Sequence, residues 1–197
     1  GSGAGPMSWR QGMKAGMDFR FVHAADLHLD SPFKGVTVDE GVRALLQEST
    51  FRAFRRIVDV CLAEKAAFLL LAGDLFDAKD RSVRARVRLA QELARLDGAG
   101  VQTFIVHGNH DPLLPDRAPG TGLPPSVKVF GPDWEEVEVR RSDRVLCRVQ
   151  GVSYPEEKVT GNLALRFGRR GDEFTIGLLH ANLGGESSGH ANYAPCS

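Results

Sequence analysis

Clusters of carboxylate, amide and imidazole side chains recur along the chain with a spacing that could bind metal ions. Asp26 and His28 stand two apart in a segment that we expect to be extended, so both side chains leave the same face and can reach one ion. These ligand types, without a thiolate, favour Mn²⁺, Fe or Zn²⁺ over a structural zinc site rich in cysteine. The clusters are Asp26-Leu27-His28, Gly73-Asp74, Gly108-Asn109-His110-Asp111 and His180.

Asp74 is the carboxylate that we expect to be shared between two metal ions, because the clusters hold more ligands than one ion needs. Metals bridged in this way lie about 3.5–4 Å apart. Together they clamp a phosphate and acidify the water between them, which produces hydroxide at neutral pH. The pattern therefore predicts a site that can hold a phosphate and produce hydroxide beside it.

The segments between the clusters alternate between strand and helix patterns. Phe68–Ala72 and Val101–Val106 are continuous apolar runs, typical of strands buried on both faces, and Phe19–Ala24 is a shorter run. This β-α-β-α-β order predicts an α/β fold with a parallel sheet. Ligands bind at the carboxyl edge of such sheets, so the clusters should converge on one cleft. Apolar residues three and four apart predict helices from Val42 to Leu62 and over the stripe Val83, Val87, Ala90, Leu93 and Ala94.

A second sheet is predicted after the proline-rich segment 112–125. The alternation Val137-Glu138-Val139 is typical of a half-exposed strand. A short helix near Leu163–Arg166 precedes a last strand, Phe174–Leu179, which delivers His180. The other strand candidates are Val127–Phe130 and Val145–Val152.

The composition of the chain is that of a globular protein, because 42% of its 197 residues are hydrophobic and 25% are charged. We see no linker, and no apolar run approaches the roughly 18 residues of a membrane span. The 25 basic and 25 acidic residues balance, so net charge alone indicates no polyanionic partner. The three cysteines lack CxxC spacing, which favours a reducing compartment, and we expect a cytoplasmic protein.

The clusters resemble the motifs of the calcineurin-like metallophosphoesterases. The segments from His23 to Phe33 and from Gly73 to Ser82 (GDLFDAKDRS) are similar to the YhaO-type bacterial branch, whose members are described as DNA repair exonucleases related to the SbcD nuclease subunit. The resemblance runs from Phe19 to Ser197. It implies an α/β/β/α sandwich of two mixed sheets flanked by helices, with the final C-terminal elements missing.

The resemblance also implies which residues hold metal. Asp26 and His28 would hold the first ion, and Asp74 would bridge the two. Asn109 and His180 would hold the second ion. Two divalent ions are therefore implied, with Mn²⁺ expected first and Fe or Zn²⁺ as alternatives.

A catalytic histidine outside the metal shell is implied as well. His110 would stabilise or protonate the leaving oxygen, and Asp111 would orient it. We interpret His23 and His107 as strand histidines that line the site from behind.

The implied activity is that of a metal-dependent phosphodiesterase, and more narrowly a DNA repair exonuclease that acts on DNA ends. DNA would be its substrate and an SbcC-like ABC-type ATPase its partner, with no membrane involved. Two alternatives stay open: a phosphoesterase for small or cyclic phosphodiesters, and a non-catalytic scaffold that binds DNA or an ATPase. Arg81, Arg84, Arg88 and Arg95 have helical spacing and either track a DNA backbone or form a solvated helix face, and we favour the second interpretation.

The two ends of the chain carry separate expectations: the first residues precede the domain, and the last residues belong to a domain that is incomplete. Residues 1–17 look like an expression scar and a disordered start, so we place the metallophosphoesterase domain at 18–197. The family closes its site with a Gly-His-x-His segment, which Gly189-His190-Ala191-Asn192 resembles except that Asn192 replaces the second histidine. We therefore expect the domain to stop before its last motif, with His190 as an alternative ligand and with weak or no activity from these residues alone.

Overall fold

The structure of the protein is a computed structural model that describes residues 18–31, 39–77, 82–113, 122–169, 171–183 and 195–196. Our expectations for residues 1–17, for Arg81 and for the segment Gly189–Asn192 lie outside the described residues. Within the described part of the chain, no helix combines the length and the apolar character that crossing a membrane requires.

The first sheet is parallel, and its strands run in the order β1-β2-β3-β4. Ala24, Ala72 and Val106 end the first three strands at one edge, since Ala24 lies beside Leu71 and Ala72 lies beside Val106. The predicted α/β order is therefore confirmed, and the segments with the polar clusters leave the sheet at the same edge. The strands are β1 (Phe21–Ala24), β2 (Phe68–Ala72), β3 (Gln102–Val106) and β4 (Val127–Val129).

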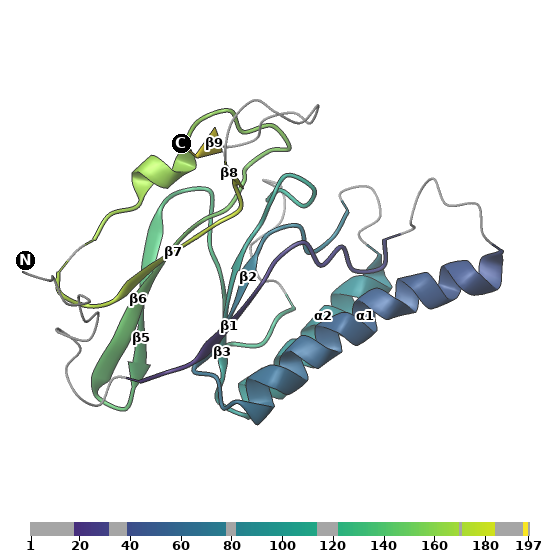
Figure 1. Ribbon diagram of the computed structural model, residues 1–197, viewed down its shortest axis with the longest axis horizontal. Helices are drawn as coiled ribbons and strands as arrows, with labels where there is room; N and C mark the ends of the chain where they lie inside the picture. Colours follow the sequence, from purple (N-terminus) through teal and green to yellow (C-terminus); the bar gives the residue numbers. More distant parts are fainter. Residues whose placement is uncertain are drawn as a thin grey trace, which may run out of the picture.

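Strand β2 separates two hydrophobic cores, because its alternate side chains point to opposite faces of the sheet. Leu69 and Leu71 belong to the core beneath the helices α1 (Glu40–Ala63) and α2 (Val83–Gly98). Phe68, Leu70 and Ala72 belong to the core shared with the second sheet. The two helices lie along one face of the first sheet, and the second sheet lies on the other (Figure 1).

Both helices begin where a polar side chain binds a free amide of the first turn. Asp39 accepts a hydrogen bond from the amide of Val42 at 2.9 Å. Ser82 accepts one from the amide of Ala85, also at 2.9 Å. Caps of this kind contribute about 1 kcal/mol to helix stability.

The buried face of α2 differs from the predicted stripe. Val83 is 73% exposed and Val87 is 48% exposed, so the start of that stripe faces solvent. Leucine side chains bury more apolar area than valine or alanine, and the helix accordingly turns its leucines toward the sheet. The buried residues of α2 are Ala85, Leu89, Leu93 and Leu96.

The described arginines of the predicted cationic stripe form ion pairs with α1. Arg84 and Arg88 both reach Glu48, at 2.6 and 3.4 Å. Arg95 reaches Asp59 at 2.6 Å. These arginines are exposed, which agrees with the favoured interpretation as a solvated helix face, and their ion pairs connect the two helices along their seam.

The second sheet is mixed, because β5 pairs with β6 in antiparallel orientation and β6 pairs with β7 in parallel. Phe104 of the first sheet stacks on Phe130, which follows β4, with ring centroids 6.2 Å apart. The Phe130 ring in turn packs directly against Gly151 of the second sheet, where a Cβ atom would lie 2.2 Å from it. The three strands of the second sheet agree with predicted segments, and β5 is half-buried as expected. The prediction that Val127–Phe130 also belongs to the second sheet was wrong, because this segment forms β4 beside β3 in the first sheet. The strands of the second sheet are β5 (Glu135–Arg141), β6 (Arg144–Val152) and β7 (Thr175–Leu179).

Short elements follow the strands of the second sheet. The predicted short helix is a 3₁₀ helix, η1 (Leu163–Arg166). β8 (Asn182–Leu183) pairs with β9 (Pro195–Cys196), and this pair was not predicted because two-residue strands carry no alternation. The order of layers is helices, first sheet and second sheet, which confirms the expected two-sheet architecture.

Candidate metal centre

Asp74, Asn109 and His180 meet at the carboxyl edge of the sheets, and we call these three residues the inner group. Nε2 of His180 lies 3.1 Å from Oδ1 of Asn109 and 3.4 Å from Oδ2 of Asp74. Asp26 lies beside them, since its carboxylate, that of Asp74 and the His180 ring each offer a ligand atom within 4.8 Å of the others. Four of the predicted metal ligands are therefore neighbours.

The orientation of the His180 ring prepares Nε2 to bind a cation. Nδ1 lies 2.9 Å from the carbonyl oxygen of Ala72, to which it donates its proton, so that Nε2 of the neutral ring offers a lone pair. The oxygens of Asn109 and Asp74 that face this lone pair are also acceptors. Three converging acceptors repel one another unless a positive charge lies between them. A divalent cation satisfies all three, so the residues present fit the metal that the motifs imply.

Two glycines at the strand ends make room for the inner group. A Cβ atom at Gly73 would lie 2.7 Å from Nδ1 of His180, and Gly73 also has a φ of +86°. A Cβ atom at Gly108 would lie 2.3 Å from Oδ1 of Asp74. Both distances are too short for any larger residue, so the glycines are required by the close approach of these side chains.

The backbone of the ligand segments is itself unusual. Asp26, His28 and Asp74 all have positive φ, at 54°, 41° and 52°. Left-handed backbone at a residue other than glycine costs about 1–3 kcal/mol and collects at functional sites. The strain is held by the pairing of the two segments, since Asp26 donates to the carbonyl of Gly73 and His28 to that of Asp74.

This backbone also corrects the prediction that Asp26 and His28 leave an extended segment together. Because the backbone is left-handed at both residues, their side chains separate into different groups. Asp26 faces Asp74 and His180, whereas Nδ1 of His28 lies 2.9 Å from Oδ1 of Asp77.

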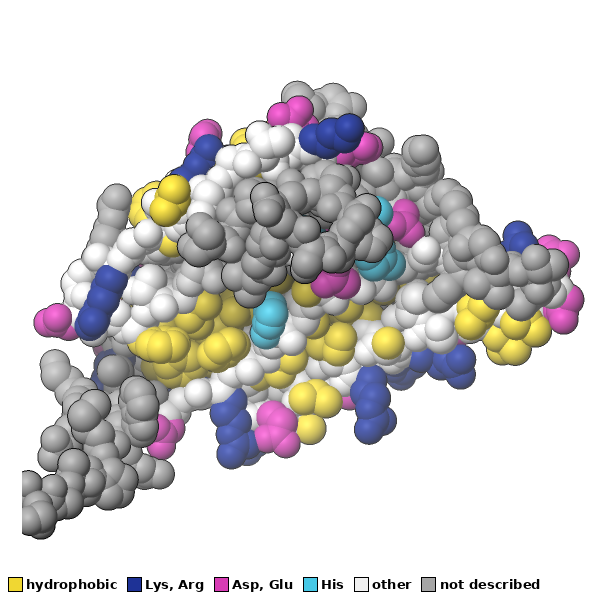
Figure 2. Space-filling view, turned by 45° about the horizontal axis from the view of Figure 1, so that its top comes forward, with side chains coloured by type: hydrophobic (Ala, Val, Ile, Leu, Met, Phe, Trp, Pro, Cys, Tyr) yellow, Lys and Arg dark blue, Asp and Glu magenta, His cyan; other side chains and the backbone are white. Residues whose placement is uncertain are grey.

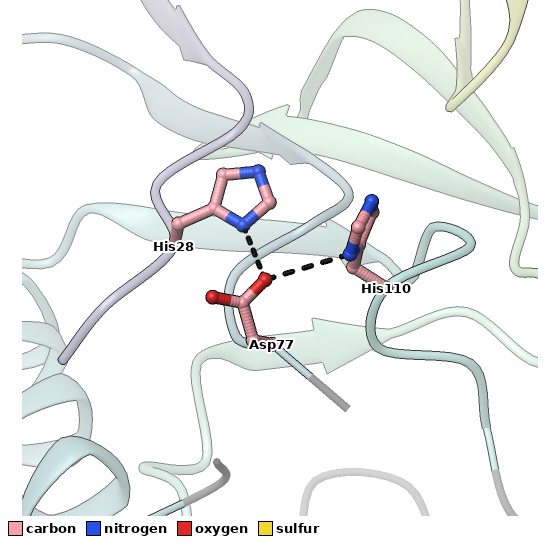
Figure 3. Close-up of side chains that lie close together, drawn as sticks. All are labelled: His28, Asp77 and His110. Carbon is pink, nitrogen blue, oxygen red and sulfur yellow. Dashed lines mark hydrogen bonds and ion pairs between the residues drawn. The ribbon is translucent and has the colours of Figure 1, made fainter. Parts of the chain in front are cut away.

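His28, Asp77 and His110 form a second cluster, which we call the outer group (Figure 3). Nδ1 of His110 lies 3.5 Å from the same Asp77 oxygen that His28 contacts. In Figure 3 the other ring nitrogen of each histidine points away from Asp77. A carboxylate that binds one nitrogen of a histidine commonly orients the other nitrogen toward a metal or a substrate. Figure 2 shows histidine and acidic side chains close together on the surface.

The two groups differ in the electrostatics of their carboxylates. Burial raises the pKa of the Asp74 carboxyl, although the amide of His110 donates to Oδ1 at 2.9 Å. At Asp77 burial acts in the same direction, but hydrogen bonds from Ser31 and His28 outweigh it and lower the pKa. Asp77 therefore carries its charge without a metal, whereas Asp74 is helped by a cation.

The sequence predicted that Asp111 orients His110, but the Asp111 carboxylate contacts other groups. Its fully buried carboxylate accepts hydrogen bonds from the amides of Asp74, Leu75 and Gly108, at 3.1, 2.9 and 2.8 Å. It also lies 3.1 Å from Nδ1 of His107. Asp111 thus joins the loop after β3 to the loop after β2 and supports the backbone of Asp74.

Asp77 received no role from the sequence motifs, and it is the carboxylate beside His110. Its only signal was its position in the segment from Gly73 to Ser82 that carried the resemblance. Of the two histidines expected behind the site, His107 contacts Asp111, whereas His23 is exposed on β1.

The calcineurin-like phosphoesterase family matches residues 19–193, and the chain belongs to this family. The uncharacterized metallophosphoesterase YhaO of Bacillus subtilis is 39% identical over 181 residues, which are 90% of this chain and 44% of that protein. The DNA double-strand break repair protein Mre11 of Thermoplasma acidophilum is 26% identical over 134 residues, 67% of this chain and 34% of that protein. One subunit of the SbcCD nuclease of Rhodobacter capsulatus is 32% identical over 102 residues, 51% of this chain and 23% of that protein. The resemblance drawn from the motifs is confirmed, and the chain spans less than half the length of these relatives.

Proposed function

We propose that this chain carries the metal centre of a phosphodiesterase that hydrolyses DNA ends with the help of two divalent ions. The observation that carries the proposal is the convergence of three acceptor atoms in the inner group, which calls for a cation. Bound divalent ions stabilise charge on a phosphate and lower the pKa of water, which is the chemistry that phosphodiester hydrolysis needs. The metal-binding family to which the chain belongs supports the same conclusion.

Each ion has a set of candidate ligands in this chain. Asp74, Asn109 and His180 would hold one ion. Asp26 would hold the other ion together with Asp74. His28 belongs to the outer group, and it would join them as a ligand only through Nε2, the ring nitrogen that does not face Asp77. Oxygen and imidazole ligands suit Mn²⁺, with Fe and Zn²⁺ as alternatives.

His110 is the candidate for moving a proton to the leaving oxygen. Its side chain is 52% exposed, so a bound substrate can reach it. Nδ1 of His110 faces Asp77, and in Figure 3 the second ring nitrogen points away from this carboxylate. When both of its ring nitrogens carry a proton, a histidine held in this way can give the proton of the second nitrogen to an alkoxide as it leaves phosphorus, and it keeps the proton on Nδ1.

The choice of DNA as substrate rests on the names of the related proteins, which include a DNA repair protein and a nuclease subunit. We also propose that the protein acts in the cytoplasm, as its cysteine pattern favours, and that it pairs with an ABC-type ATPase, as the family resemblance implies. The name of one relative, which is a subunit of a larger nuclease, supports the presence of a partner. Phosphoesterase activity on small or cyclic phosphodiesters is the second candidate. The residues of the inner and outer groups would act on the phosphate, and their roles do not depend on recognition of a base.

The test compares turnover of linear duplex DNA, 2′,3′-cyclic AMP and bis-p-nitrophenyl phosphate by the protein, with Mn²⁺ and with EDTA. We expect Mn²⁺-dependent release of nucleotides from DNA ends. Faster turnover of the cyclic nucleotide than of DNA would favour the second candidate. DNA binding without any turnover in Mn²⁺, Fe²⁺ or Zn²⁺ would contradict both and favour a scaffold.

A further inference from the structure

The residues that follow β6 lie against both the inner group and the loop of His110, although they include no candidate ligand. Ser153 and Tyr154 are both fully buried. The ring of Tyr154 meets that of His180 edge to face, with centroids 5.8 Å apart and planes at 77°. Contacts of this geometry favour one orientation of both rings.

Tyr154 also holds both ends of the loop that carries Asn109 and His110. Its amide donates to the carbonyl of His107 at 3.0 Å, and its carbonyl accepts from the amide of Leu113 at 2.9 Å. The backbone of one residue therefore fixes the loop, while its ring contacts the histidine that faces the loop.

Ser153 anchors this arrangement to the core between the sheets. Its hydroxyl donates to the carbonyl of Phe130 at 2.6 Å and accepts from the amide of His107 at 2.9 Å. Its own amide donates to the carbonyl of Gly131 at 2.8 Å. Tyr154 consequently has little freedom to move, and the orientation of its ring is set by buried contacts.

We propose that Tyr154 is a positioning residue that keeps the His180 ring turned with Nδ1 on Ala72 and Nε2 toward Asp74. The inference rests on the proposed function, because it assigns to Tyr154 control over metal affinity at the inner group. The contact joins two aromatic rings, so phenylalanine should replace tyrosine while an aliphatic residue should not. Loss of a residue that supports a metal-binding histidine typically weakens metal binding by about 10–100-fold.

The experiment measures Mn²⁺ affinity by calorimetry for the wild-type protein and for Tyr154→Phe, Tyr154→Leu and Tyr154→Met. We expect Tyr154→Phe to bind nearly as wild type and Tyr154→Leu to bind about 10–100-fold more weakly. Tyr154→Met keeps most of the volume without an aromatic edge and decides the question if the leucine variant does not fold. Phe54→Leu, in the equally buried core under α1, is the matched control and should lose stability without losing Mn²⁺ affinity.

A second readout needs no metal. Nitrogen NMR of ¹⁵N-histidine-labelled, metal-free protein reports which ring nitrogen of His180 carries the proton. We expect the proton on Nδ1 in wild type and in Tyr154→Phe, and a mixture of both forms in Tyr154→Leu or Tyr154→Met.

The outcomes separate the two proposals. An unchanged His180 signal in the leucine and methionine variants, or equal loss of Mn²⁺ affinity in Phe54→Leu, overturns the role of Tyr154. If wild type binds no divalent metal, the proposed function fails, and the NMR signal still decides whether Tyr154 orients His180.

Discussion

The inner and outer groups lie side by side, yet they are built in different ways. The Asp74 and His180 side chains are only 4% and 17% exposed, and backbone amides, a carbonyl and two glycines define their places. In the outer group, His28 and His110 are 32% and 52% exposed, and they are connected through a single carboxylate, Asp77. The comparison indicates that the inner group is preorganised to hold an ion, whereas the outer group is accessible to a substrate and to protons from water.

The largest expected effect is that of Asp74→Asn. This change weakens the only ligand proposed for both ions, so Mn²⁺-dependent hydrolysis should fall to the metal-free background. Folding should survive, because the variant removes a buried charge whose burial is unfavourable without metal. Turnover assays and thermal unfolding check both parts, with Asp133→Asn in an exposed loop as the control. Turnover close to that of wild type in excess Mn²⁺ would contradict the bridging role.

His110→Ala should act on turnover alone. If the outer group moves protons, hydrolysis should slow by about 10²–10⁴-fold while Mn²⁺ affinity stays unchanged. The exposed His23→Ala is the matched control and should alter neither quantity. A missing binding step in a Mn²⁺ titration of His110→Ala would make this histidine a metal ligand and would contradict its role in moving a proton.

Asp111→Asn tests whether Asp111 holds the backbone of Asp74 in the inner group or orients His110 in the outer group. The amide that replaces one carboxylate oxygen cannot accept from the backbone amides, so we expect a loss of about 1–3 kcal/mol of stability. Mn²⁺ affinity should fall by about 10–100-fold, since the backbone of Asp74 loses its partner. If turnover falls at saturating Mn²⁺ and affinity stays constant, Asp111 acts on His110 after all, as the sequence suggested.

Asp77→Asn should have the smallest effect and the most specific one. The amide oxygen can still accept from one histidine, but the negative charge of Asp77 beside both rings is lost. We expect a decrease in turnover of about 10-fold, within the range of a supporting contact, with stability unchanged. The measurement is the pH dependence of turnover for Asp77→Asn, compared with that for wild type. An unchanged profile and rate would separate Asp77 from catalysis.

Much of the fold could be predicted from the sequence because its pattern is repetitive. Buried strands such as Phe68–Ala72 and helices of three to four turns or more leave a periodic signal that depends on neighbours in the chain. The polar clusters were found for a related reason, since each one directly follows such a strand. The face of α2 was misplaced because valine and leucine count alike in a periodic stripe, although they bury different areas.

The sequence does not predict which side chains of the site contact one another. The spacing of Asp26 and His28 predicts an extended pair, but their left-handed backbone depends on hydrogen bonds to the segment after β2. The contacts of Asp111 with Asp74 and of Asp77 with His110 likewise join loops that are more than thirty residues apart in sequence. Contacts of this kind follow from the packing of loops and leave no periodic trace.

The origin of His180 in the second sheet has a consequence for how the protein folds. Nδ1 of His180 contacts Ala72 across 108 positions of the chain. Closing this loop therefore costs more chain entropy than closing the shorter loops that connect β1, β2 and β3. Contacts between distant residues form late in folding, and an intermediate with only the first sheet would hold Asp26, Asp74 and Asn109 without this histidine. Capture of Mn²⁺ during refolding should therefore lag behind the recovery of helical circular dichroism and mark the moment at which the second sheet docks.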